Sequence, residues 1–503
     1  MSTNRALTWL TRVAARRAGH LPGLTAAVAG LFALLFLGPA LARLAYPYDL
    51  DFVEDGMLLQ AWRHAQSQPV YVAPNADFAP NVYMPLYTWL AGQLMRLTGL
   101  SYWPLRLLSL VATLGKAALI GWIARRESGR PRLAAACAGH YLGGKRLTGF
   151  WYDLARVDAL YTALALGGCA LGVYSGHKRW GQAAAASVLA LAFFTKQTAV
   201  VFAGLLMVVI ALAAGRRAWL FPALFAALTA IPYGLISMQT GGWFAFHTFG
   251  AAAGDPVEAG RVLRYFDFEL GGGMGALSVL AAGAAWWGFR RSGRAGWPWL
   301  FGLAAAILVS GLGRASVGGN LNNLMPAYAF LCLAPALAAR QWLGRPPAIA
   351  DRREPLLAAL VLLQFALGVY NPLRALPTPA DWAAGDRFVA RLRAIDGEVL
   401  VLMHPYYAVL AGKTPATQII HLWYYYTYRG LPWPEDFVAR LQARHYAAVI
   451  SDESLFELEP ALKALVEADY VAAERLSAAE APRTLSGMIV RPQVLYRPRP
   501  AGY

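Results

Sequence analysis

The sequence predicts an α-helical polytopic membrane protein with a small α/β domain after its last apolar run. Three observations carry this prediction. The chain of 503 residues is 58% hydrophobic and only 15% charged, with a mean hydropathy of +0.41. Apolar runs long enough to cross a bilayer recur along most of the chain. Beyond about residue 371 the composition changes to that of a soluble segment.

The formal net charge of +17 bears on the class of partner. In a soluble chain it would suggest nucleic acid, but here Lys and Arg cluster in the short connections between apolar runs, which is the topology signal of a membrane protein. We therefore expect no nucleic-acid partner. The cysteines lie inside apolar runs without the spacing of metal ligands, so we expect them to be packing residues: Cys137, Cys169 and Cys332.

The first apolar run, about residues 21–45, follows a basic stretch that contains Arg5, Arg12, Arg16 and Arg17. It is too long for the core of a signal peptide and lacks a small-residue cleavage site. We predict a retained first span with a cytoplasmic N-terminus in a bacterial-type inner membrane. The loop 46–100 then lies outside.

The next apolar run, about 84–99, is short, rich in aromatic residues and contains Arg96. A span there would place Arg125 and Arg126 outside, so we predict that this run lies in the membrane interface. The later spans are predicted at about 104–124, 132–150, 157–175, 181–195, 197–214, 218–238, 270–289, 296–313, 323–340 and 355–371. Every second connection is basic, which gives about eleven spans. An alternative joins 181–195 and 197–214 into one helix interrupted near Lys196.

These predictions divide the chain into a membrane domain, 1–371, and a soluble extracytoplasmic α/β domain, 372–503. In the second domain the residues 398–403, 446–452 and 492–496 have the composition of strands. A helix is expected within 434–444, because Pro434 and two acids stand at its start and arginines near its end.

Four carboxylates follow the first span within seven positions: Asp49, Asp51, Glu54 and Asp55. Ionisable groups held at a bilayer surface are candidates for function. The alternative is an ordinary solvated loop.

Several cations fall on the predicted outer side, against the positive-inside trend, and Arg156, Lys196 and Arg314 are among them. Cations in such places favour an anionic ligand, and near the outer leaflet a lipid phosphate fits, because Arg binds phosphate in bidentate fashion and Lys as a point charge. The alternative is that they contact headgroups or pair with acids such as Asp153 and Asp158.

Five stretches of the chain, which begin at Glu54, Tyr83, Leu154, Phe194 and Asn320, occur in an order that resembles a known family, the polyprenyl-phosphate-sugar-dependent glycosyltransferases of the GT-C fold, which include protein mannosyltransferases and the aminoarabinose transferases of lipid A. The acidic pair Glu54-Asp55 follows the first span, and the Tyr83–Trp89 segment is similar to the family's Y-x-x-P-L-Y-x-W. The other motifs are Leu154 to Leu160, which is similar to Arg-x-Asp-Ala-Leu at the head of a span, Phe194 to Thr198, similar to a Leu-Thr-Lys turn, and the Asn-rich Asn320 to Pro326. The likeness covers about residues 25–340.

The resemblance implies an integral membrane glycosyltransferase. Its donor would be a polyprenyl-phosphate sugar, its surroundings membrane lipids, and its acceptor an extracytoplasmic lipid, glycan or protein. A carboxylate base would take the proton of the attacking hydroxyl or amine. Glu54 and Asp55 are the first candidates, but the family usually shows Asp-Glu where this chain has Glu-Asp, and Asp51 competes for the role. A divalent ion, Mg²⁺ or Mn²⁺, shared by Glu54 and Asp55 is an alternative.

The resemblance and the position of the cations on the predicted outer side together give the other site residues, Arg314 on its position alone. Lys196, Arg156 and Arg314 would bind the donor phosphate and stabilise the leaving group. The expected substrate-binding residues are Asp158, Tyr83, Tyr87 and Trp89. The three aromatic residues suit sugar faces, although an aromatic belt at the membrane interface explains them equally well.

Two other classes of function compete. A secondary transporter would carry ionisable residues near the middle of the membrane, where this chain has little beyond Lys116. An inactive binding or assembly protein with the same architecture is the other alternative, because fold does not imply function.

Overall fold

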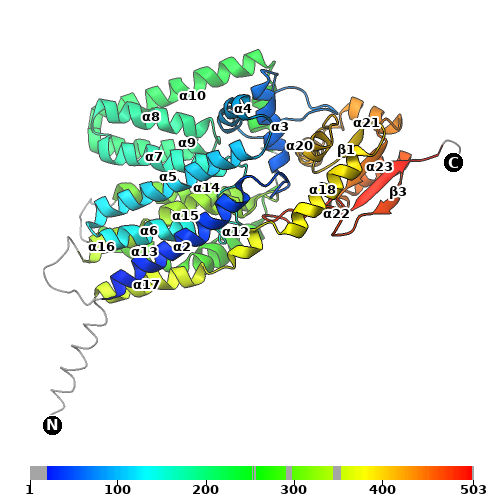
Figure 1. The fold of residues 1–503 in the computed structure, drawn as a ribbon. Helices are drawn as coiled ribbons and strands as arrows, with labels where there is room; N and C mark the ends of the chain where they lie inside the picture. The colour runs from blue at the N-terminus through cyan, green and yellow to red at the C-terminus, as the bar shows by residue number, and fades with distance from the viewer. Residues whose placement is uncertain (1–19, 252, 254–255, 291–296, 344–352, 501–503) are drawn as a thin grey trace, which may run out of the picture.

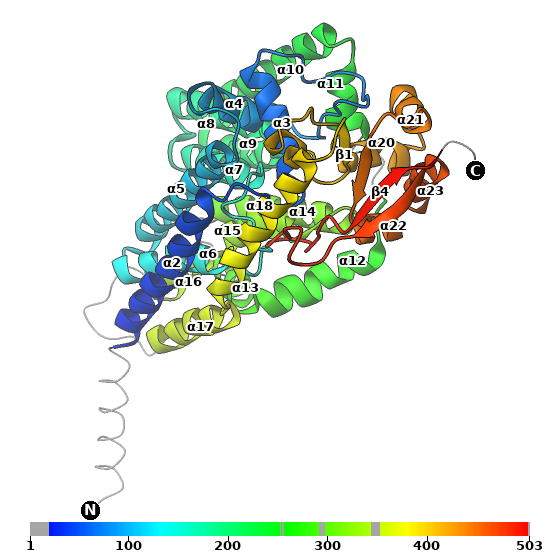
Figure 2. The same cartoon turned by 45° about the vertical axis from the view of Figure 1, so that its right-hand side comes forward.

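The computed structural model describes residues 20–251, 253, 256–290, 297–343 and 353–500. A bundle of helices forms the larger part, and the C-terminal segment packs against one end of it (Figures 1 and 2). The basic residues predicted to precede the first span, Arg5, Arg12, Arg16 and Arg17, lie outside the described residues.

The apolar runs of the sequence form the bundle helices. These are α2 (Leu21–Leu44), α5 (Trp103–Ser128), α6 (Pro131–Gly143), α7 (Asp158–Ser175), α8 (Arg179–Phe193), α9 (Ala199–Ala214), α10 (Leu220–Gln239), α13 (Gly275–Arg290), α14 (Trp297–Ala315), α15 (Met325–Leu331), α16 (Ala334–Trp342) and α17 (Arg353–Leu367). Each predicted span range overlaps such a helix, and α15 and α16 share the range 323–340. The helices α8 and α9 are separate, and the turn between them holds Lys196.

Length and composition make five helical stretches suited to crossing a membrane, or up to seven if each of two bent helix pairs counts as one span. One of the five is the continuous stretch Ala199–Gln239, which contains α9, the short η1 (Gly215–Trp219) and α10. The structure therefore supports a helical membrane protein, while the number of about eleven spans stays a prediction.

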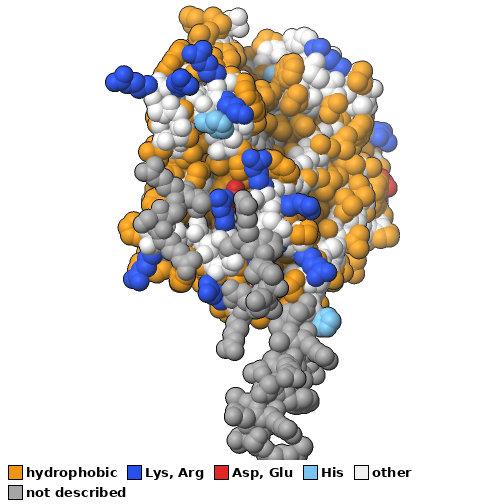
Figure 3. Space-filling view, turned by 90° about the vertical axis from the view of Figure 1, so that its left-hand side faces the viewer, with side chains coloured by type: hydrophobic (Ala, Val, Ile, Leu, Met, Phe, Trp, Pro, Cys, Tyr) orange, Lys and Arg blue, Asp and Glu red, His pale blue; other side chains and the backbone are white. Residues whose placement is uncertain are grey.

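Side-chain contacts define two ends of the bundle. At one end Glu127 of α5 accepts hydrogen bonds from Tyr174 of α7 (2.7 Å) and Trp299 of α14 (3.2 Å), and it pairs with Arg340 of α16. At the other end Lys196 forms an ion pair with Asp158, the first residue of α7. Figure 3 shows the end remote from the C-terminal segment, where Lys and Arg side chains gather among hydrophobic ones. The predicted topology places the basic connections on one side of the membrane, and this distribution agrees with it.

The first loop contains two helices, α3 (Glu54–Ala65) and α4 (Leu86–Thr98), which pack against each other. On α4, Trp89 and Leu97 are exposed, as an interfacial helix requires, but its place in the membrane stays a prediction. The remaining short elements outside the C-terminal segment are α11 (Trp243–Ala245), η2 (Phe246–Ala251), α12 (Ala259–Arg264), η4 (Tyr265–Gly273), η5 (Leu321–Leu324) and η6 (Pro372–Ala375).

The C-terminal segment forms a four-stranded mixed sheet of order β1-β2-β4-β3, in which β1 and β2 are parallel and the other pairs antiparallel. The strands are β1 (Val399–Val401), β2 (Ala448–Ser451), β3 (Tyr470–Arg475) and β4 (Val494–Pro498), and the helices are α18 (Pro379–Arg393), α19 (Tyr406–Leu410), α20 (Ile419–Arg429), α21 (Glu435–Gln442), α22 (Glu453–Leu458) and α23 (Pro460–Asp469). Two of the three stretches of strand-like composition contain β1 and β2, and the third overlaps β4. The sequence did not reveal β3, of which only Tyr470 is buried.

The first loop and the C-terminal segment share buried polar contacts. His404, after β1, lies between two carboxylates, with Nδ1 2.7 Å from Asp49 and Nε2 3.0 Å from Asp452. Asp55 accepts a hydrogen bond from the Tyr406 N–H at 2.9 Å. The C-terminal segment therefore helps to hold the acidic loop in place.

Candidate active site

A row of alternating acidic and basic side chains lies where the first loop, the bundle and the C-terminal segment meet. Arg156 Nη1 is 2.8 Å from Asp51 Oδ2, and Arg156 Nε is 3.7 Å from Asp158 Oδ2. Lys196 Nζ lies 2.8 Å from the other oxygen of Asp158. The structure thus brings together four predicted site residues from three separate parts of the chain.

The charged side chains of this row are shielded from solvent, and their charge states depend on one another. Arg156 and Lys196 are largely shielded from solvent, and the two carboxylates are buried. Burial alone lowers the pKa of Lys196, but the Asp158 carboxylate more than offsets this effect, so its pKa is raised. Both cations therefore remain charged.

Two asparagines complete the row at its Lys196 end. Asn322 donates to Asp158 Oδ2 at 2.9 Å, and Lys196 donates to Asn323 Oδ1 at 3.1 Å. Both belong to η5, just before α15. The Asn-rich stretch that carries the family resemblance thus supplies two polar contacts to the row.

Asp51 differs from the other acids of the first loop because one of its oxygens is free. Its Oδ2 accepts from Arg156, while its buried Oδ1 has no hydrogen-bond partner among the described residues. Burial raises the pKa of Asp51 to about 6, although Arg156 opposes the shift. A buried carboxylate with a raised pKa and a free oxygen has the properties of a general base.

Glu54 is held in a closed ion pair. Its two oxygens accept from Arg106 of α5 at 2.7 and 3.1 Å, and from the backbone N–H groups of Leu50 and Ala155, both at 2.7 Å. Four donors occupy the carboxylate, which is fully buried. This arrangement favours a structural role for Glu54 over the role of base that the resemblance implies.

Asp55 also has its oxygens engaged, by the Tyr102 hydroxyl and by the Tyr406 N–H. Burial and the nearby Asp49 carboxylate raise its pKa. Glu54 and Asp55 thus accept hydrogen bonds from different donors, and a divalent ion shared between them stays a prediction. Within the described residues no group of three or more His, Cys, Asp or Glu side chains is arranged to hold a metal ion.

Arg314 lies beside the row but pairs elsewhere. Its Nε is 3.0 Å from both oxygens of Glu269, and its Nη1 donates to the carbonyl of Gly319 at 2.5 Å. The binding of one phosphate by these three cations stays a prediction: Arg156 and Lys196 share Asp158 as a partner in the row, whereas Arg314 pairs with Glu269 outside it. Its link to the row runs through Asn323, which donates to the neighbouring Gly313 carbonyl at 3.2 Å.

The three predicted aromatic residues have different surroundings. Lys196 Nζ lies 5.6 Å from the centre of the Tyr83 ring, which places Tyr83 at the row. Tyr87 is buried and donates to the Leu105 carbonyl at 2.8 Å, so it packs α4 on α5. Trp89 is 47% exposed on α4. The structure places neither Tyr87 nor Trp89 in the row.

Sequence reasoning did not single out Trp151, whose ring lies 5.2 Å from the Arg156 guanidinium, or Gly487, which packs on Trp151 and Asp51. Trp151 stands five positions before Arg156 in the sequence. Gly487 gives no signal in the sequence, because its contact with residue 51 depends on the docking of the C-terminal segment.

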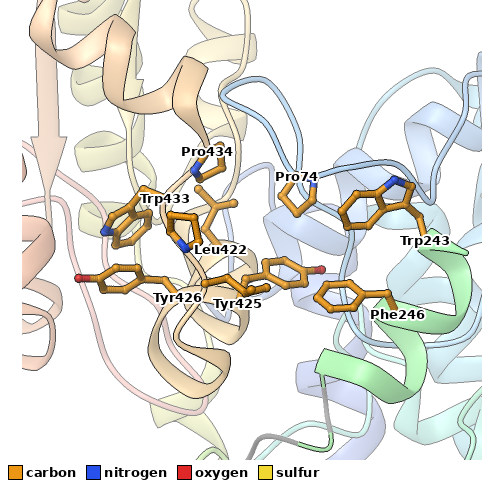
Figure 4. Close-up of a pocket in the computed structure, with 10 residues that line it drawn as sticks. Pro74, Trp243, Phe246, Leu422, Tyr425, Tyr426, Trp433 and Pro434 are labelled. Carbon is orange, nitrogen blue, oxygen red and sulfur yellow. The ribbon is translucent and has the colours of Figure 1, made fainter.

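A concave region apart from the charged row lies between the bundle and the C-terminal segment (Figure 4). It has a volume of about 210 Å³. Pro74, Trp243 and Phe246 form one side, and Tyr425 and Trp433 contribute to the other. The lining residues are aromatic, proline or leucine, so this pocket offers flat apolar faces, in contrast to the charged row.

No family model matches the chain, and no curated protein matches it. Solved structures do. ArnT from Cupriavidus metallidurans bound to undecaprenyl phosphate aligns with a TM-score of 0.60 and 13% identity, over 95% of this chain and 98% of ArnT. The protein has the GT-C fold.

Two further structures of the same fold come from an archaeon. An oligosaccharyltransferase of Archaeoglobus fulgidus tethered to an acceptor peptide aligns with a TM-score of 0.50 and 13% identity, over 94% of this chain and 74% of the enzyme. AglB from the same organism, in complex with an inhibitory peptide and a dolichol-phosphate, aligns with a TM-score of 0.51 and 12% identity, over 88% of this chain and 70% of AglB. The GT-C fold that the motifs imply is confirmed, and at these identities the likeness extends to the fold alone.

Proposed function

We propose that this protein is a membrane glycosyltransferase that moves a sugar from a polyprenyl-phosphate-linked donor to an acceptor on the predicted outer side of the membrane. The observation that carries the proposal is the row in which a carboxylate with one free oxygen stands beside two buried cations. Support also comes from the solved GT-C structures, because ArnT binds undecaprenyl phosphate and AglB binds a dolichol-phosphate.

Asp51 is the base in this proposal. Its Oδ1 accepts the proton of the acceptor group while the acceptor atom forms a bond to the anomeric carbon. The bond from that carbon to the phosphate oxygen breaks, and the electron pair leaves with the polyprenyl phosphate. A base whose pKa lies near the working pH suits this step, because it is ionised before the transfer and still basic enough to take the proton. Glu54 is a weaker candidate, since four donors occupy it.

Arg156 couples the two halves of the reaction. It pairs with Asp51 before transfer. When Asp51 takes the proton, this ion pair loses its negative partner just as the leaving phosphate gains a charge. Arg156 and Lys196 then stabilise the leaving group, as preorganised cations do in a site shielded from water.

Lys196→Ala tests the donor site. We expect donor binding to weaken by about 2–5 kcal/mol, as for removal of one partner of a desolvated charge pair. The affinity of purified wild type and variant for a polyprenyl phosphate is measured by calorimetry, with the exposed Lys178→Ala as the control. Unchanged affinity in Lys196→Ala would remove Lys196 from the site.

A transporter is the second candidate, and Lys116 is the observation in its favour. This lysine is buried in α5, where its Nζ donates to the Ala159 carbonyl at 3.3 Å. Mass analysis of the donor separates the two functions, because a transferase releases polyprenyl phosphate and a transporter leaves its substrate unchanged.

A further inference from the structure

A loop of the C-terminal segment lies directly over Asp51. The N–H groups of Leu485 and Ser486 both donate to the Leu50 carbonyl, at 3.0 and 2.9 Å. These two bonds fix the loop to the residue that precedes Asp51. Gly487 follows and is exposed to solvent.

Gly487 covers Asp51 without a side chain. Its φ of +66° is one that residues with a Cβ rarely adopt. A Cβ at this position would lie 2.9 Å from Asp51 Oδ1 and 2.6 Å from Trp151 Cζ2. Both distances are too short for a real Cβ contact. The residue between the candidate base and solvent is therefore a glycine that leaves no room for a methyl group.

Two buried polar atoms beside Gly487 lack a partner among the described residues. One is the acceptor Asp51 Oδ1, and the other is the donor Trp151 Nε1. Buried polar atoms without partners are uncommon in folded proteins and call for an explanation. A group that donates to Asp51 and accepts from Trp151 would satisfy both.

We propose that the nucleophile of the acceptor is a hydroxyl group, which binds between Asp51 and Trp151 on the side that Gly487 covers. A hydroxyl has one proton and two lone pairs. It can donate its proton to Asp51 Oδ1, accept from Trp151 Nε1 and still direct one lone pair at the anomeric carbon. A neutral amine has one lone pair, and a hydrogen bond from the indole would occupy the pair needed for attack. This inference rests on the proposed function and adds the acceptor class.

In the transfer step the hydroxyl oxygen forms the new bond to the anomeric carbon, and its proton goes to Asp51. The bond between the anomeric carbon and the phosphate oxygen breaks, and polyprenyl phosphate leaves with the electron pair. Trp151 holds the hydroxyl oxygen in line and takes no proton.

Two variants test the inference in the full-length enzyme supplied with a polyprenyl-phosphate sugar. Trp151→Phe keeps an aromatic ring beside Arg156 and removes only the N–H, so turnover should fall about tenfold, as for the loss of one buried hydrogen bond. Gly487→Ala should lower turnover about a hundredfold by displacing Asp51 or Trp151. Donor affinity should stay unchanged in both.

Gly412→Ala is the matched control for Gly487→Ala. Gly412 has a φ of +78°, but a Cβ there would meet nothing within 4 Å. Both variants carry the same kind of backbone strain, so a loss of turnover confined to Gly487→Ala reports the contact with Asp51 and Trp151. Equal turnover in the two glycine variants would overturn the role of Gly487.

An infrared titration gives a readout that does not need activity. The carboxyl band that is lost in Asp51→Asn is assigned to Asp51. The charged neighbours of Asp51 are Arg156, Glu54 and Asp49. Gly487→Ala should move the midpoint of this band to higher pH, because a methyl group against the carboxylate removes it further from water. Gly412→Ala should leave it in place, and an unmoved midpoint in Gly487→Ala would contradict the contact.

The acceptor class is tested with an alkyl glycoside, which offers only hydroxyl groups, and an alkyl amine. We expect transfer to the glycoside. Transfer to the amine alone, or full turnover in Trp151→Phe, would overturn the inference while the proposed function stands. If neither the acceptors nor water receive sugar from any polyprenyl-phosphate donor, both proposals fail.

Discussion

At the scale of single residues, Glu54 and Asp51 differ in what surrounds them. Glu54→Gln leaves the buried Arg106 without its anionic partner, and breaking a buried pair in this way costs about 3–5 kcal/mol of the free energy of unfolding. We expect that loss in thermal or denaturant unfolding, with the exposed Asp267→Asn as a control that changes stability by about 0.5 kcal/mol or less. A stable but inactive Glu54→Gln would return the role of base to Glu54.

The charged residues of the row could be predicted one by one, because each stands beside an apolar run where topology does not require it. The choice among the carboxylates could not be predicted. It depends on Arg106, one turn into α5, and on the backbone N–H of Ala155, which together occupy Glu54 and leave Asp51 with a free oxygen. Such contacts join residues about fifty to a hundred positions apart and have no local signature.

At the scale of secondary-structure elements, His404 joins the first loop to the sheet. Burial lowers its pKa, but Asp452 and Asp49 outweigh that effect, so the pKa is raised well above 6.5. A cation with a raised folded-state pKa contributes stability that is fully present below the unfolded pKa and is lost as the pH rises through the folded value. We therefore expect the C-terminal segment to become more sensitive to protease at alkaline pH.

His404→Gln should remove this alkaline transition and lower stability at neutral pH, because it leaves two buried carboxylates without a cation. The matched control is His445→Gln, since His445 pairs with Glu398 on the surface. Limited proteolysis and thermal unfolding across the pH range measure both effects. An alkaline transition that persists in His404→Gln would show that another group controls the docking.

The elements themselves were largely predictable. Long apolar runs form helices in every predicted range, and strand-like composition located β1, β2 and β4. The strand β3 was not predicted, because most of its side chains are exposed and it is held in place by pairing with β4. The position of the sheet against the first loop was not predictable either, because it depends on contacts between distant parts of the chain, such as Asp49 with His404.

At the scale of the whole molecule, the two ends of the bundle predict the orientation in the membrane. Lys and Arg gather at the end remote from the C-terminal segment (Figure 3), and positively charged connections favour the cytoplasmic side. We expect a C-terminal tag to be accessible to protease added to spheroplasts, and a tag at the N-terminus to be protected. A protected C-terminal tag would place the row on the inner side and contradict the predicted topology.

The central claim is that Asp51 serves as the base of a transfer from a polyprenyl-phosphate sugar. The most direct measurement is the release of polyprenyl phosphate and glycosylated acceptor by purified wild type and Asp51→Asn, followed across pH. We predict that wild-type turnover falls as the pH drops through about 6, the raised pKa of Asp51, because the base must be ionised. Asp51→Asn should lose about a hundredfold or more in rate, with intact folding and donor binding. Near-normal turnover in Asp51→Asn would contradict the account.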